Sequence, residues 1–115
     1  SSAKIAEEIR RAIDDARPKR MKKDDKKQLA IDLGVLWGDA LCTAVGWNWT
    51  GVQLAEDTIV HAVCSPKRSH AVDPLQLAFD LITSRKKTNN SLLLFNMIVA
   101  GNLPNAPDQG FCWLS

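Results

Sequence analysis

The residues best suited to catalysis in this 115-residue sequence are Cys64, His70 and Asp73. They have the chemical types of a nucleophile, a base and an orienting carboxylate, and such a site is defined by geometry rather than by chain order. Nothing in the sequence, however, places a helix N-terminus or a nucleophile elbow at Cys64. A small cysteine-dependent hydrolase or transferase is therefore only an alternative function. The function that the remaining residues favour is binding to a protein partner, for which we expect no catalytic residues.

Histidine and cysteine could also bind a metal. His61 and Cys64 are three residues apart, and Cys42 or His70 could complete a zinc site. On an alternating strand, however, His61 and Cys64 point to opposite faces, which argues against a shared ion. The three cysteines are too far apart for a zinc ribbon or a disulfide framework. We expect no metal, no cofactor and small buried thiols, with a single Cys64–Cys112 bridge as the alternative.

Four acidic residues form the predicted partner-binding surface. Asp32 and Asp39 are seven residues apart, which places them about 10 Å apart along one face of a predicted helix. General acid–base catalysis needs carboxylates held closer together in a cleft. Glu56 and Asp57 fall in a predicted turn between two strands. The four residues predict an acidic surface for a basic protein partner, and a merely solvated face is the simpler alternative.

The charge distribution excludes other classes of partner. The net charge is +2, but residues 1–27 carry ten Lys/Arg and six Asp/Glu, whereas residues 28–84 carry two and six. The basic run 17–27 contains no aromatic residue and is interrupted by Asp24 and Asp25, so it indicates a solvated linker rather than a nucleic-acid surface. No apolar run approaches about 18 residues, and no secretory segment is evident. We expect a cytoplasmic protein that binds neither nucleic acid nor membrane.

The stretch 28–64 organises the chain. Apolar residues recur at helical spacing up to Val45, where Gly46 ends the pattern, and Gly34 and Gly38 predict close packing against a sheet. Residues 47–52 and 58–64 read as two strands around a turn at 55–57. Asp73-Pro74 begins a further helix, and residues 92–100 form the last one.

This order, helix–helix–strand–strand–helix–helix, predicts an α+β fold. We expect a small antiparallel sheet of two to three strands packed by about four helices. Residues 1–23 are expected to form an N-terminal helix and a basic linker, and residues 24–115 a single α+β domain. Residues 65–70 are either a loop or the start of a third short strand.

Several short motifs resemble a known group of proteins. The runs LGVLWGDAL (Leu33–Leu41), GWNW (Gly46–Trp49) and AVCSP (Ala62–Pro66), followed by the helix that starts at Asp73-Pro74, are similar to small bacterial domains of unassigned function. Some of those domains lie beside toxin genes and resemble immunity proteins of polymorphic-toxin or secretion-system effectors. The likeness covers about residues 29–82, and its motifs are structural, so it transfers no catalytic residue.

The resemblance implies a cytoplasmic immunity protein that binds a cognate toxin or effector and neutralises it by occlusion. A secretion chaperone or adaptor is a further alternative. Its client would be held by the apolar stripe of the N-terminal helix, whose members are Ile5, Ile9, Ala12, Ile13 and Ala16. The sequence leaves the oligomeric state open.

Overall fold

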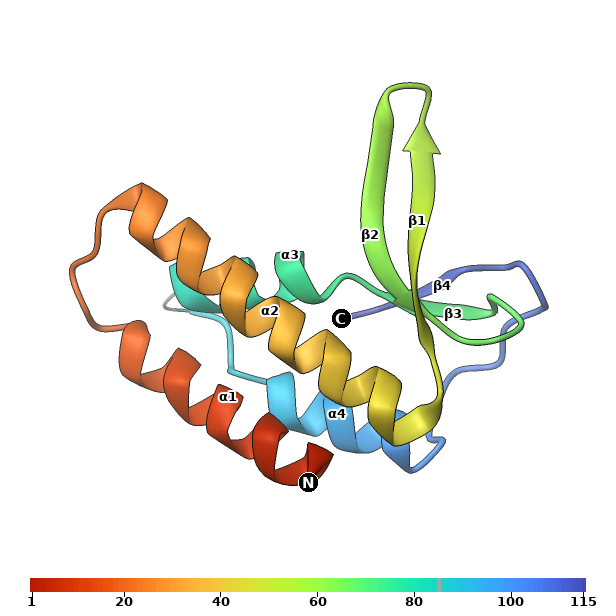
Figure 1. The fold of residues 1–115 in the computed structure, drawn as a ribbon, viewed down its shortest axis with the longest axis horizontal. Helices are drawn as coiled ribbons and strands as arrows, with labels where there is room; N and C mark the ends of the chain where they lie inside the picture. Colours follow the sequence, from red (N-terminus) through yellow and green to blue (C-terminus); the bar gives the residue numbers. More distant parts are fainter. Residues whose placement is uncertain (85) are drawn as a thin grey trace.

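The computed structural model describes residues 1–84 and 86–115. Within them the chain has four helices and one four-stranded sheet, which confirms the predicted α+β class. Figure 1 shows the helices gathered together and the first two strands projecting from the body as a hairpin. The elements in chain order are α1 (Ser2–Ala16), α2 (Lys23–Val45), β1 (Asn48–Ala55), β2 (Thr58–Cys64), β3 (His70–Val72), α3 (Pro74–Thr83), α4 (Ser91–Val99) and β4 (Cys112–Leu114).

Helix α2 is the central element, since it contacts the other three helices and leads into β1. Trp37 anchors it and is only 2% exposed. Its indole Nε1–H donates to the carbonyl of Ser91 at 3.1 Å, and its ring meets Phe95 edge-on, with the centroids 5.8 Å apart. The indole therefore buries a large apolar area without leaving its N–H unpaired. The helix ends as predicted at Gly46, whose φ of +73° favours glycine.

The two glycines of α2 allow close approach of neighbouring elements. A Cβ atom at Gly34 would lie 2.8 Å from the carbonyl oxygen of Pro74 and 2.9 Å from the Cα of Leu75. A Cβ atom at Gly38 would lie 2.2 Å from the indole of Trp49. The predicted close packing is therefore present, but only Gly38 contacts the sheet, whereas Gly34 contacts the first turn of α3.

Helix α1 belongs to the same core. Its apolar stripe is buried against the other helices at Ala6, Ile9, Ile13 and Ala16. Polar bonds attach the same helix to the segment after α3. Arg17 donates to the carbonyls of Ser84 and Lys87, and the Asn89 amide donates to the carbonyl of Arg10 at 3.0 Å. Most of the stripe is thus covered by the chain itself rather than left open for a client, although Ile5 at its start is 40% exposed.

The sheet differs from the prediction in strand number and direction. Its order is β1-β2-β3-β4, with β1–β2 and β2–β3 antiparallel and β3–β4 parallel, so it is mixed rather than antiparallel. The β4 strand lies in a proline-containing tail and has only three residues, too few for a recognisable alternation. Its parallel pairing requires a crossover, which α3 and α4 provide.

Helix α2 also meets, by length and composition, the criterion for a membrane-crossing helix. No membrane-crossing segment is expected from the lengths of the apolar runs in the sequence. Core helices of soluble proteins meet this criterion as well, and α2 here packs against α1, α3, α4 and β1. Its apolar composition is consistent with its central place in the fold.

The close contact at Gly34 yields a stability prediction. Alanine favours a helix over glycine by about 1 kcal/mol, but its Cβ would meet the backbone of α3, and overpacking of this kind costs about 1–3 kcal/mol. We expect Gly34→Ala to lower the free energy of unfolding by up to about 2 kcal/mol, as measured by urea denaturation.

The matched control is Thr43→Ala, because Thr43 is exposed on the same helix. That substitution should change the unfolding free energy by no more than about 0.5 kcal/mol. A Gly34→Ala protein more stable than the parent would contradict the close packing of α2 against α3.

Candidate functional site

The structure places the four predicted partner-binding carboxylates in two separate regions. Asp32 and Asp39 lie on the exposed side of α2, while Glu56 and Asp57 form the turn at the tip of the β1–β2 hairpin (Figure 1). All four side chains are exposed. Asp39 is held in place, since it accepts a hydrogen bond of 2.8 Å from the indole Nε1–H of Trp49. They therefore form two acidic sites rather than one patch.

Two exposed apolar side chains lie between the α2 carboxylates. Val35 is 39% exposed and Leu36 is 52% exposed, although both belong to a helix whose other faces are buried. Asp32, Val35, Leu36 and Asp39 have the spacing i, i+3, i+4 and i+7, so they share one side of the helix. We call these four residues the α2 stripe. It combines an apolar centre with an acidic residue at each end.

The alternative catalytic constellation is not assembled. Cys64 pairs with Ala71 in the register of β2 and β3 and is buried with it in a small cluster on one face of the sheet. His70 precedes Ala71, so its side chain points to the opposite face, where it stacks on Trp47. Its Nδ1 bonds the hydroxyl of Ser69 at 2.8 Å. Cys64 and His70 therefore do not form a nucleophile–base pair.

The thiols have the environment of structural cysteines. Burial is the main factor raising the pKa of Cys64, and burial together with the nearby Asp39 raises the pKa of Cys42. All three cysteines are free, so the alternative Cys64–Cys112 bridge is not present. Within residues 1–84 and 86–115, no three His, Cys, Asp or Glu side chains are grouped so that they could hold a metal ion.

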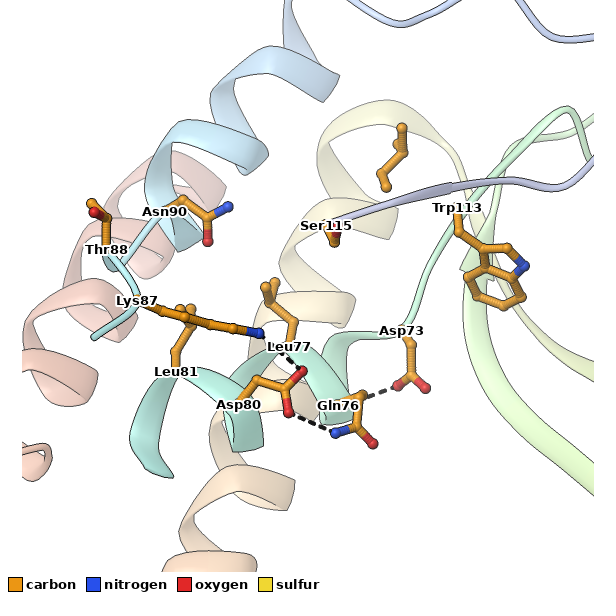
Figure 2. Close-up of a pocket in the computed structure, with 11 residues that line it drawn as sticks. Asp73, Gln76, Leu77, Asp80, Leu81, Lys87, Thr88, Asn90, Trp113 and Ser115 are labelled. Atoms are coloured by element: carbon orange, nitrogen blue, oxygen red, sulfur yellow. Dashed lines mark hydrogen bonds and ion pairs between the residues drawn. The ribbon is translucent and has the colours of Figure 1, made fainter. Parts of the chain in front are cut away.

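Asp73 has a structural role and also lines a cavity. As predicted, it caps α3, because its Oδ1 accepts from the backbone N–H of Gln76 at 3.0 Å. The cavity, of about 440 Å³, lies between α3, the segment 87–90 and the C-terminal strand (Figure 2). Trp113 lies on its β4 side, and Leu77 and Leu81 contribute apolar surface from α3.

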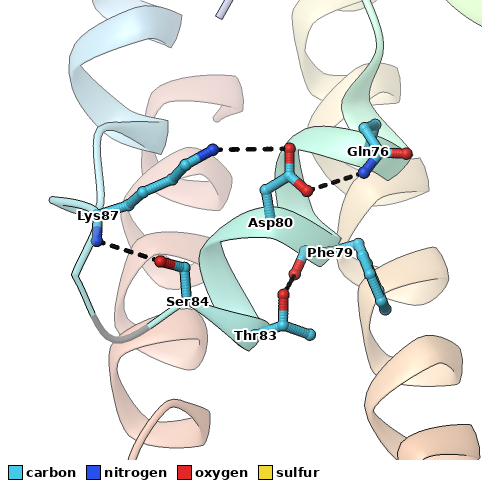
Figure 3. Close-up of polar contacts among 6 residues, drawn as sticks. All are labelled: Gln76, Phe79, Asp80, Thr83, Ser84 and Lys87. Atoms are coloured by element: carbon cyan, nitrogen blue, oxygen red, sulfur yellow. Dashed lines mark hydrogen bonds and ion pairs between the residues drawn. The ribbon is translucent and has the colours of Figure 1, made fainter.

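A polar network holds the α3 side of this cavity (Figure 3). The Gln76 amide donates to Asp80 Oδ1 at 2.8 Å, and Lys87 Nζ lies 3.9 Å from Asp80 Oδ2. Both oxygens of Asp80 thus have partners. This cavity is not predicted from the sequence, because its walls come from residues 40 positions apart, and only the Gln76/Asp80 spacing of four is visible beforehand.

A groove of about 710 Å³ lies on the other side of the α3 N-terminus. It separates the N-terminal half of α2 from β2, and Ile31, Ile59 and Phe79 give it apolar walls. Asp73 and Gln76 line both the groove and the cavity, so the two concave regions adjoin at the start of α3. The described residues therefore form two concave regions with apolar walls, and Cys64, His70 and Asp73 are not assembled into one site in either of them.

The burial of Cys64 predicts low reactivity. Because its pKa is raised and its side chain is only 2% exposed, little reactive thiolate is available near neutral pH. We expect iodoacetamide to modify Cys64 more slowly than the partly exposed Cys112, as measured by peptide mass spectrometry, and this difference should disappear in urea. Faster modification of Cys64 in the folded protein would instead support the cysteine-dependent enzyme.

Comparisons with protein-family models, with curated proteins and with solved structures find no significant match to this chain. Its functional assignment consequently rests on its own residues and their arrangement. The resemblance of Leu33–Leu41 and Gly46–Trp49 to domains of the immunity type stays a prediction.

Proposed function

We propose that this chain is a cytoplasmic inhibitory binding protein of the immunity type, which neutralises a bacterial toxin or effector by covering its working surface. The main support for this proposal is the composition and exposure of the α2 stripe. Exposed apolar residues are common singly, but here two adjoin on the central helix and are flanked by carboxylates. A helix side of this kind is suited to a protein partner, and neither nucleic acid nor membrane is part of the proposal.

The charges of the stripe favour a basic partner. Opposite charges across an interface mainly accelerate association and select the right partner, while the apolar centre contributes affinity through burial. Leu36 is the residue best placed for that burial, since 52% of its surface is accessible before binding. Asp32 and Asp39 would then lie at the rim of the contact and orient the two proteins during encounter.

The hairpin tip provides a second acidic contact. Leu54 and Ile59 flank Glu56 and Asp57 and are 55% and 64% exposed. The tip thus repeats the composition of the α2 stripe on an element that projects from the body (Figure 1). A projecting hairpin can enter a concave active site, which is how occlusion would stop the partner's reaction without any chemistry by this chain.

The experiment that tests the proposal is affinity capture from a lysate of the native host, with mass spectrometry of the bound proteins. We expect one stoichiometric partner that carries a toxin-like catalytic domain and loses its activity in the complex. Absence of such a partner, in a lysate shown to contain the neighbouring gene products, would contradict the proposal.

The role of charge can be tested on the captured partner. Asp32→Asn/Asp39→Asn retains an acceptor for the Trp49 indole while removing two charges. We expect association to slow several-fold at low salt, with a smaller difference at high salt, because screening weakens exposed charges. Glu56→Gln/Asp57→Asn should act in the same direction at the hairpin tip. Stopped-flow mixing measures both rates.

The control is Glu7→Gln/Glu8→Gln, which removes two exposed charges from α1, outside the proposed contacts. If this variant slows association as much as the α2 double variant does, the effect comes from overall charge, and the assignment of the α2 stripe is wrong.

A further inference from the structure

Asp73, which lines the cavity beside α3, has one carboxylate oxygen that no described residue engages. Oδ1 of Asp73 caps the helix, and its second oxygen has no hydrogen-bond or ion-pair partner within residues 1–84 and 86–115. Asp80 differs, because Gln76 and Lys87 engage both of its oxygens. Among the described lining residues, two acids and one lysine leave the cavity with a net charge of −1. The free oxygen of Asp73 is the acceptor available to a guest.

An exposed indole also lines this cavity. Trp113 is 41% exposed and lines the cavity from β4, while Asp73 lines it from the α3 side (Figure 2). Pairing of β4 with β3 fixes the backbone that carries Trp113. An aromatic ring and a carboxylate that line the same cavity form an environment that attracts a cation, most strongly a planar one that can stack on the ring.

The remaining surface suits a long aliphatic stem. Leu77, Leu81 and Leu114 line the cavity with apolar atoms. Its volume of about 440 Å³ holds a long side chain together with part of its backbone. Arginine combines methylene groups with a planar head that can stack on an aromatic ring while one of its N–H groups donates to a carboxylate oxygen, whereas lysine carries a compact charge that cannot stack in this way.

We propose that this cavity receives an arginine side chain presented by the protein partner, with the guanidinium between Asp73 and Trp113. This inference rests on the proposed function, because it identifies a feature of the partner inferred there. It adds a third contact that is separate from the α2 stripe and the hairpin tip. The guest donates to the free Asp73 oxygen, so the helix cap remains in place.

The test begins with this chain alone and Nα-acetyl-argininamide as the probe, followed by NMR of the tryptophan indole N–H signals. The matched probe is the citrulline analogue, which has nearly the same shape without the charge. We expect saturable shifts of the Trp113 signal with argininamide and none with the citrulline analogue. Equal shifts with both probes, or no saturable shift with either, would overturn the proposal.

Two variants locate the bound guanidinium. Asp73→Asn removes the charge and keeps a good helix cap, and it should weaken argininamide binding roughly tenfold. Trp113→Leu keeps an apolar wall and should weaken binding about fivefold. Asp108→Asn, which changes a carboxylate outside the cavity, should have no effect. Urea denaturation establishes that each variant is folded, and unchanged affinity in a folded Asp73→Asn protein would contradict the assignment.

The captured partner distinguishes the source of the guanidinium. If the proposal holds, Asp73→Asn weakens partner binding by a similar factor, and substitution of one partner arginine by lysine removes the difference between Asp73→Asn and the parent. Argininamide binding without any effect of Asp73→Asn on the partner would assign the cavity to a free guanidinium compound and overturn the partner contact. Failure to capture a toxin would overturn the proposed function but would not change the probe result.

Discussion

The close packing of α2 against the start of α3 is the constraint on which the rest of the structure depends. Gly34 lets the Pro74 carbonyl approach the helix backbone, and Trp37 fills the adjacent space and donates its N–H to Ser91. This contact fixes the N-terminus of α3, and therefore the position of Asp73 between the groove and the cavity. The buried side of α2 packs against the other helices. Its opposite side, which carries the α2 stripe, is exposed to solvent.

The same arrangement separates the residues that stabilise the fold from those proposed to bind a partner. Cys64 and His70 hold opposite faces of the sheet, so the groups that look most reactive in the sequence stabilise the fold. The exposed positions instead combine carboxylates with apolar side chains, as at Leu36 on α2 and Ile59 on β2. Such surfaces favour recognition of a basic protein, and the guanidinium proposed to bind at Asp73 would likewise pair a positive group of the partner with a carboxylate of this chain. Rigid helix packing behind these surfaces preorganises them, which lowers the entropy cost of binding.

Local signals in the sequence predict much of this fold. Caps and turns are decided by neighbouring residues, so they can be predicted locally. This holds for the start of α3 at Asp73-Pro74, the end of α2 at Gly46 and the turn at Glu56-Asp57. Strand β4 could not be predicted, since its three residues acquire their conformation only by pairing with β3. The exposure of Val35 and Leu36 and the cavity around Trp113 depend on which elements pack together. The sequence therefore identifies the four carboxylates as candidates, whereas their division into two regions and their apolar neighbours are visible only in the fold.

The most direct test of the central claim is growth of cells that express the captured toxin together with this chain. The account predicts that the parent chain restores growth, that Leu36→Ser restores it far less, and that Leu93→Ser protects as well as the parent. Leu93 is the matched control because it is 62% exposed on α4, away from the α2 stripe. Protection that is equal for Leu36→Ser and the parent, or no protection despite a stable complex, would contradict neutralisation through the α2 stripe.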